Sequence, residues 1–395
     1  MPKILVLGGA GHIGSAMVSE LIKLEPTAKI TIGDKNVEKA KEVAENTGGD
    51  IEVLRVDATD NDSLVGAFRG FDVVISAVGP FYKFGVPVLR AALRAGVGFV
   101  DINDDWDATE EALKLHEEAK ERGVTAIIGM GATPGITNLL ALHGAQRLDK
   151  VEEVLTYWIW TAIDPRMGQA IVKHYFHAIS GNVPSYKDGE RVMVKALSEP
   201  ECVEFPKPIG AWEVANVGHP EPITIPRYIK AKRVCNKGGI WPSKLNEIAK
   251  VFSTLGITSS KEIRIDGRVY EARDIAVAIT NALPDLIPPE EIGELIGPLY
   301  ERLGEYALTG LGLAVVVKGV KDGNELTFRY GIACKDAARA TALPAALATL
   351  ELARAEKLES GVFPPEANVI SVEKLISEIK KEIRIELAET ELKTL

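Results

Sequence analysis

Three glycines near the N-terminus have the spacing of a dinucleotide-binding turn. An apolar run over residues 3–7 is followed by Gly9, Gly11 and Gly14, which fit G-x-G-x-x-G. In such a turn the first glycine permits a tight bend, the second lets the backbone approach a pyrophosphate, and the third lets the helix lie close to the strand. The N-terminus of the following helix offers free N–H groups to the phosphates. The residues predicted to bind the cofactor here are Gly9, Gly11, His12, Ile13 and Gly14.

An acidic residue, Asp34, ends the next apolar run, at the distance from Gly14 that a βαβ unit requires. Its carboxylate can accept hydrogen bonds from both hydroxyls of an adenosine ribose, and it would repel a 2′-phosphate. The sequence therefore favours NAD over NADP. Lys35 keeps NADP open, because its cation could receive a phosphate if Asp34 turned away.

Further cofactor contacts are expected in the loops after the other strands, because ligands of an open parallel sheet bind beyond the carboxyl ends of its strands. Asp57 and Ala58 are positioned for the adenine ring. The small residues after the fourth strand would pass close to the pyrophosphate and nicotinamide ribose. Gly131 belongs to a glycine- and proline-rich loop expected beside the nicotinamide. Ordinary strand-end turns and an interdomain linker are the alternative readings. The predicted contacts are Asp57, Ala58, Ala77, Val78, Gly79, Pro80 and Gly131.

These residues need a doubly wound α/β fold to bring them together. Residues 1–130 alternate helical patterns with six apolar runs, which predicts a parallel sheet covered on both faces. The expected strands are residues 3–7, 28–33, 51–56, 72–78, 98–102 and 125–129. Helical patterns return at residues 341–358 and 371–383. We therefore predict a discontinuous Rossmann domain made of residues 1–135 and about 340–395.

The middle of the chain predicts a second domain, of mixed α+β type, over residues 136–339. Asp322-Gly323 between two apolar runs is a good hairpin signal. This domain is expected to bind the substrate and to support a homodimer. Its expected strands are residues 153–162, 191–197, 223–229, 262–273, 313–320 and 325–333.

Composition argues against several classes of protein, namely nucleic-acid-binding, membrane-spanning, secreted and metal-binding proteins. The 395 residues carry a formal net charge of −10, which argues against nucleic-acid and membrane partners. No apolar run reaches transmembrane length and no signal peptide is expected. Three widely spaced cysteines fit a reducing cytoplasm. No metal site is expected, because His174 and His177 have no cysteine or acidic cluster beside them.

Several longer motifs resemble the saccharopine dehydrogenase-like proteins, which include lysine 6-dehydrogenases. They are GGAGHIG, SAVGPFYKFGVPVLRAALRAGVGFVDIND, GMGATPGITNLLA, GHPEP and TALPAALATLELARAEKLESGVFPPE. The resemblance implies NAD(P)-linked hydride transfer at a carbon–nitrogen bond of an amino acid or polyamine, through an imine. Saccharopine reductases usually carry an acid and a histidine in the segment where this chain has Thr133 and Asn138. That difference favours the lysine dehydrogenase type over saccharopine itself.

An imine mechanism also needs a side chain that carries a proton. His219 ranks first because prolines on its C-terminal side would hold it in place. The predicted catalytic residues are His219, Tyr82, Asp105 and His177, with Lys83, Asp104 and His174 as further candidates. A substrate carboxylate needs a cation, for which the candidates are Arg166, Arg227 and Lys83.

Two other functions compete with this reading. A short-chain reductase or sugar epimerase would need a Tyr-x-x-x-Lys pair on a helix, and the one match, Tyr228 and Lys232, falls in a strand-like run. A non-catalytic NAD-binding sensor could share the same fold, since fold does not imply function.

Overall fold

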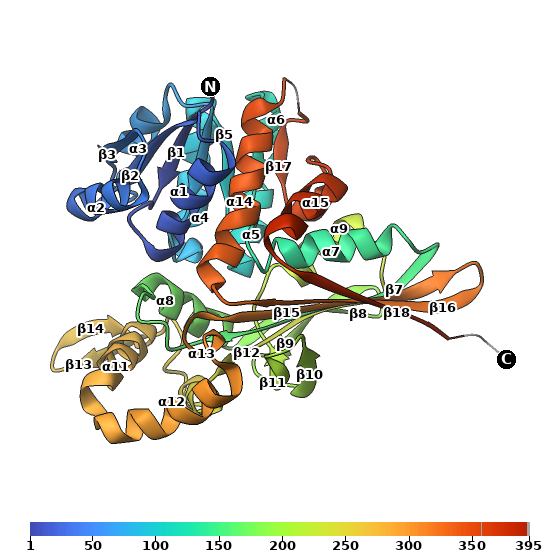
Figure 1. The fold of residues 1–395 in the computed structure, drawn as a ribbon. Coiled ribbons are helices and arrows are strands. Elements are labelled where there is room, and N and C mark those ends of the chain that lie inside the picture. Colours follow the sequence, from blue (N-terminus) through green and yellow to red (C-terminus); the bar gives the residue numbers. More distant parts are fainter. Residues whose placement is uncertain (357, 393–395) are drawn as a thin grey trace. The chain divides into compact units, whose positions relative to one another are not determined.

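The computed structural model describes residues 1–356 and 358–392, which form two compact units. Unit 1 contains residues 1–143 and 338–383, and unit 2 contains residues 144–337 with the C-terminal segment from Arg384. Figure 1 shows the elements of each unit along the chain. The α/β class, with a parallel N-terminal sheet and a second mixed sheet, is confirmed. In the part of the chain that the structure describes, no helix combines the length and the apolar character needed to cross a bilayer.

Unit 1 is built on a seven-stranded parallel sheet with the strand order β17-β6-β5-β4-β1-β2-β3. The central strands are apolar along their length because helices bury both faces of such a sheet. The strands are β1 (Lys3–Leu7), β2 (Lys29–Asp34), β3 (Ile51–Arg55), β4 (Val73–Ser76), β5 (Gly98–Asp101), β6 (Thr125–Ile127) and β17 (Gly361–Phe363). The six strands before β17 are those that the N-terminal periodicity predicts.

Some helices of unit 1 begin or end at recognisable capping residues. Asp60 caps α3 by accepting from two backbone N–H groups, and Gly96 ends α4 in the left-handed conformation. The helices are α1 (His12–Leu24), α2 (Val37–Thr47), α3 (Asn61–Phe68), α4 (Phe81–Ala95), α5 (Trp106–Leu113), α6 (His116–Glu121), α7 (Ile136–Ala145, whose last residues belong to unit 2), α14 (Ala337–Arg354), the 3₁₀ turn η1 (Pro365–Ala367) and α15 (Val372–Glu382).

Unit 2 is built on a mixed sheet whose longest path runs β10-β11-β12-β7-β15-β16-β18; β8 pairs with β12, and β9 pairs with β8. β7 and β12 are parallel, whereas β7 and β15 are antiparallel. The predicted hairpin joins β15 to β16, with Asp322 and Gly323 both at positive φ. The strands are β7 (Lys150–Thr161), β8 (Asn182–Lys187), β9 (Glu190–Lys195), β10 (Glu201–Phe205), β11 (Gly210–Asn216), β12 (Arg233–Trp241), β15 (Leu311–Lys321), β16 (Asn324–Cys334) and β18 (Ile385–Leu392).

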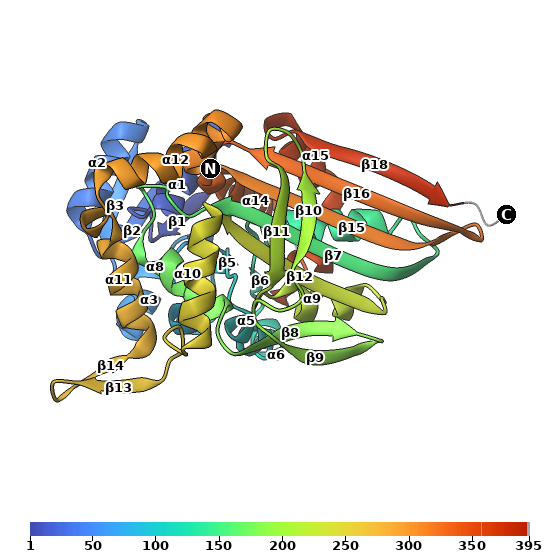
Figure 2. The ribbon, with the colours of Figure 1, turned by 90° about the horizontal axis from the view of Figure 1, so that it is seen from below.

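Helices and one separate two-stranded sheet complete unit 2 (Figure 2). The apolar side chains of Leu155, Ile159 and Phe205 belong to its core. The helices are α8 (Gln169–Ala178), α9 (Glu221–Tyr228), α10 (Ser243–Thr254), α11 (Ala272–Leu286), α12 (Pro289–Leu303) and α13 (Tyr306–Thr309). The separate sheet is the hairpin of β13 (Glu262–Ile265) and β14 (Arg268–Glu271).

Three expectations about the elements differ from the structure. Residues 223–229 lie in helix α9 and not in a strand. Residues 262–273 do not form one strand, because Asp266 and Gly267 adopt positive φ and turn the chain between β13 and β14. The C-terminal residues do not all belong to the Rossmann unit, since β18 pairs with β16 of unit 2.

Candidate functional site

The glycine turn of unit 1 has the close packing that its sequence predicts. A Cβ atom built on Gly14 would lie 2.1 Å from the carbonyl oxygen of Gly8, so only glycine allows α1 to approach the turn. The N-cap of α1 is Gly11, which has no side chain to occupy the first N–H groups of the helix. Backbone N–H groups and the helix dipole are therefore directed to this end of the sheet, where they can hold a pyrophosphate.

Asp34 stands at the end of β2, beside the glycine turn. Its carboxylate accepts hydrogen bonds from the N–H of Ala10 (3.0 Å) and of Asn36 (2.9 Å). Lys35 places its ammonium 3.5 Å from the carboxylate of Asp57. The hydroxyl of Thr59 is the main cause that lowers the pKa of Asp57, and Lys35 contributes to the same direction. Lys35, the cation that could receive a 2′-phosphate, thus already lies beside the carboxylate of Asp57.

Asp105 and Tyr82, both predicted to be catalytic, meet at the N-terminus of α4. The buried carboxylate of Asp105 accepts the backbone N–H of Tyr82 at 2.8 Å. This contact satisfies one of the N–H groups that a helix leaves unpaired at its start. In the same loop the N–H of Ala77 donates to Leu7, and α4 begins directly after Pro80. The loop after β4 is thereby fixed against the carboxyl end of β1.

A buried carboxyl group joins the loops after β5 and β6. The sequence did not predict it as part of the site. Asp101, with 1% of its surface exposed, accepts the N–H groups of Gly129 (2.8 Å) and Asn103 (3.0 Å) on one oxygen. Burial raises the pKa of Asp101 to about 7. The signal available in the sequence was an acid at the end of an otherwise apolar strand.

The loop containing Gly131 forms a compact backbone turn. The N–H of Gly131 donates to Pro134, and a Cβ on Gly135 would lie 1.8 Å from the oxygen of Gly131. The side-chain oxygen of Asn138 accepts the N–H of Gly135 at 3.1 Å, and its amide donates to the buried carboxylate of Glu366 at 2.9 Å. Glu366, more than 200 residues later in the sequence, was not predicted to take part.

Unit 2 holds a separate cluster of polar and aromatic side chains around His219. Nδ1 of the buried His219 lies 3.2 Å from the carboxylate of Glu221, which is fully buried. The rings of Trp158 and His174 each lie 5.6 Å, centroid to centroid, from the imidazole of His219. Asn236 accepts the indole N–H of Trp158 at 2.9 Å, which fixes the plane of that ring.

This cluster exists because β12 leaves space for it. A Cβ on Gly238 would lie 2.1 Å from the Trp158 ring, so the indole lies directly over that glycine. α9 begins immediately after the turn at His219, and Pro220 and Pro222 limit the backbone freedom of the segment. His174, which lies one helical turn before His177 on α8, is the histidine that contacts His219.

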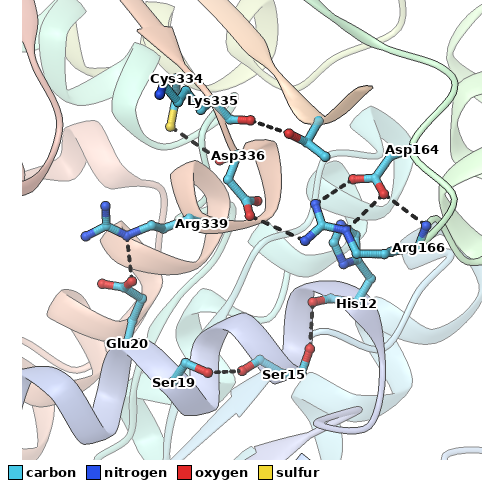
Figure 3. A network of polar contacts seen from close by, with 11 residues as sticks. His12, Ser15, Ser19, Glu20, Asp164, Arg166, Cys334, Lys335, Asp336 and Arg339 are labelled. Carbon is cyan, nitrogen blue, oxygen red and sulfur yellow. Dashed lines mark hydrogen bonds and ion pairs between the residues drawn. The ribbon is translucent and has the colours of Figure 1, made fainter. Parts of the chain in front are cut away.

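The three predicted carboxylate-binding cations lie in different environments (Figure 3 shows one of them). Arg166 already forms a two-pronged pair with Asp164, at 3.0 and 2.8 Å, and lies 3.4 Å from Asp336. Arg227 is exposed on α9. Lys83 lies 5.5 Å above the ring of Phe84. Figure 3 also shows the pair of Arg339 and Glu20, which ties α14 to α1 within unit 1.

The alternative tyrosine–lysine pair lacks the geometry of a short-chain reductase. Tyr228 is the last residue of α9 and is 42% exposed, while Lys232 lies beyond the helix. The ammonium of Lys232 pairs with Glu152 at 2.7 Å.

The chain is similar to several known proteins. Residues 4–127 match the family model of the saccharopine dehydrogenase NADP binding domain. A carboxynorspermidine synthase of Vibrio alginolyticus is 25% identical over 394 residues, covering 90% of each chain. A carboxyaminopropylagmatine dehydrogenase of Synechocystis is 22% identical over 393 residues, covering 92% of each chain.

A solved structure shares the fold over its whole length. The apo saccharopine dehydrogenase (L-Glu forming) of Saccharomyces cerevisiae has a TM-score of 0.67 and 17% identity, with full coverage of both chains. The predicted resemblance and the prediction of a bound NAD(P) cofactor are confirmed. The close approach at Gly14 and the uncapped start of α1 are what such a cofactor needs.

Proposed function

We propose that this chain oxidises or reduces a carbon–nitrogen bond. The premise is the match of residues 4–127 to the saccharopine dehydrogenase NADP binding domain. The substrate class is an amino acid that carries a second amine, such as lysine, saccharopine or a carboxylated polyamine. The observation that carries the proposal is the buried pair of His219 and Glu221 beside Trp158. When bound, the nicotinamide supplies the carbon that gives or takes the hydride.

His219 has the surroundings of a proton carrier. With a proton on Nδ1, the imidazole donates to the carboxylate of Glu221, and Nε2 is then the nitrogen that takes a proton from an amine or a water. Burial of both side chains shields the pair from bulk solvent and holds the ring in one orientation. Glu221 acts through His219 and is therefore a positioning residue.

The aromatic side of the cluster suits a cationic amine. The indole of Trp158 is held by Asn236 and lies next to His219, and an ammonium group over an indole face is stabilised by cation–π attraction. The names of the relatives from Vibrio and Synechocystis describe carboxylated polyamine-type molecules, which supports a substrate with several amines. A substrate amine bound at Trp158 would lie beside the proton carrier.

A substrate panel tests this proposal. Purified protein is incubated at alkaline pH with NAD or NADP and with lysine, ornithine, saccharopine or a carboxylated polyamine, and the absorbance of the reduced cofactor is followed. We expect turnover of at least one compound that has both a carboxylate and a second amine. Tight cofactor binding without turnover on any of them would instead support the sensor function.

We further propose that NAD is the preferred cofactor. A 2′-phosphate next to Asp34 would also meet the carboxylate of Asp57, which already engages Lys35. Replacing Asp34→Ser together with Lys35→Arg should remove the repulsion and add a fixed cation, and so shift the ratio of the two affinities toward NADP by about tenfold to a hundredfold.

Fluorescence titration of both cofactors against the wild type and the double variant measures this change. Glu38→Gln, an exposed substitution on α2, is the control and should leave both affinities unchanged. Tighter binding of NADP than of NAD by the wild type would refute the role given to Asp34.

A further inference from the structure

The hairpin of β13 and β14 has two unpaired edges. Within residues 1–356 and 358–392, each of these strands pairs only with the other, and Figure 2 shows the hairpin extending from the start of α11. Every residue of the two strands is exposed except Ile263, which is partly buried. Isolated two-stranded hairpins have marginal stability in water, and free strand edges are templates for pairing with another chain.

The base of the hairpin is firmly anchored, unlike its strands. Arg273 is buried, and its Nε donates to the carbonyl of Thr258 at 2.8 Å. Its backbone N–H donates to Ser259, and the N–H of Ala272 donates to Lys261. Ser180, next to α8, also donates to the carbonyl of Thr258. The hairpin is therefore presented in a fixed direction by a buried support.

The exposed strands carry apolar side chains that gain nothing from contact with water. Ile265, Val269 and Tyr270 expose 44%, 48% and 37% of their surfaces. Charged residues of both signs alternate with them, so that the segment from Lys261 to Glu271 is electrically neutral. The charged residues are Lys261, Glu262, Arg264, Asp266, Arg268 and Glu271.

We propose that β13 pairs antiparallel with β13 of a second copy of this chain, across a two-fold axis at Ile263. That register places Glu262 opposite Arg264 of the second copy, and Arg264 opposite its Glu262. The two isoleucines at position 263 lie opposite each other at the two-fold axis, on the other face of the sheet from these ion pairs. The inference does not depend on the proposed function.

The charge pattern favours a second copy of this chain as the partner, and it favours β13 over β14 as the strand edge that pairs. A two-fold axis perpendicular to a sheet pairs residues on the same face, and in β13 this brings opposite charges together twice. The equivalent pairing of β14 about Val269 places Arg268 opposite Tyr270 and gives no ion pair between carboxylate and cation. A neutral hairpin gives no electrostatic attraction to nucleic acid or to an anionic membrane.

A charge-swap experiment on the full-length protein tests the inference. Sedimentation velocity over a range of concentrations gives the dimer dissociation constant of the wild type, Glu262→Arg, Arg264→Glu and the double variant. Each single reversal places two like charges opposite each other and should weaken the dimer about tenfold or more. The double variant restores opposite charges and should return the constant to within about threefold of the wild type.

The control is Glu190→Arg, a charge reversal at an exposed residue of β9, which should not change the dimer. Circular dichroism of all variants verifies that the fold is kept. A monomeric wild type, single variants that dimerise like the wild type, or a double variant that remains as weak as the single ones would each overturn the inference.

Discussion

Replacing His219→Gln should reduce kcat by about 10²–10⁴, the range that a positioned proton carrier contributes. The glutamine fills similar space and can still contact Glu221, but it cannot gain or lose a proton near neutral pH. The affinity for NAD should remain unchanged, because the predicted dinucleotide contacts all belong to unit 1. Glu221→Gln keeps an acceptor for Nδ1 but loses the charge, so we expect a smaller fall in kcat and an altered pH profile.

Tyr228→Phe is the informative control for this experiment. Tyr228 would be essential in a short-chain reductase, whereas here it is an exposed residue at the end of α9. Turnover should therefore survive its replacement. His116, a histidine on α6 that is not among the predicted site residues, would be a poorer control, because its Nδ1 contacts Val362 at 3.0 Å and its ring packs on Phe363. Loss of turnover in Tyr228→Phe with activity kept in His219→Gln would reverse the assignment of the two residues.

The dinucleotide half of the site could be predicted because its determinants are close together in the sequence. Gly9, Gly11 and Gly14 act within one strand–turn–helix unit, and Asp34 ends the neighbouring strand. The alternation of apolar strands and helices then fixes which strand ends lie at one edge of the sheet. Asp101 and Glu366 were missed, since their partners Gly129 and Asn138 come from elements far along the chain.

The site in unit 2 depends on contacts that no local pattern contains. His219 was singled out from its prolines, but its neighbour Trp158 lies on a strand 61 residues earlier and fits there because Gly238 leaves space. A glycine in the interior of a strand is a sign that another group approaches closely, and this sign pointed to no particular partner.

Helix α9 shows how local propensity failed in the same region. Ile223, Thr224 and Ile225 are β-branched, which favours a strand in the sequence-based prediction. Pro222 in the first turn and Glu221 beside it are signals for the start of a helix, and those signals prevail in the structure. All three β-branched residues are buried, so tertiary packing outweighs their intrinsic preference.

Asp101 gives the second large effect that we expect, this time on stability. In Asp101→Ala the N–H groups of Gly129 and Asn103 lose their acceptor inside the core, which should cost about 3 kcal/mol of stability. Asp101→Asn keeps a carbonyl oxygen for both donors and removes the ionisable group. The two variants therefore separate loss of the hydrogen bonds from loss of the charge.

The pH dependence of stability distinguishes the variants further. Burial raises the pKa of Asp101 from 3.8 to about 7 in the folded protein, so the unfolded chain releases this proton first as pH rises. The contribution of the protonated carboxyl to stability is thus complete below about pH 4 and is lost progressively up to about pH 7. Within this window, each pH unit removes about 1.4 kcal/mol of the free energy of unfolding that the protonated carboxyl contributes.

Asp101→Asn has no ionisable group at this position and does not lose stability in this way. Its free energy of unfolding should therefore increase relative to that of the wild type between pH 5 and pH 7, and the difference should then stay constant. Urea midpoints of the full-length protein at pH 5, 6, 7 and 8 measure the difference, and midpoints are preferable because two units need not unfold together. Parallel curves for Asp101→Asn and the wild type would mean that the two N–H donors outweigh burial and keep the carboxylate ionised. In that case the loops after β5 and β6 are joined by a buried charge, and Asp101→Asn should be the less stable protein at every pH in the series.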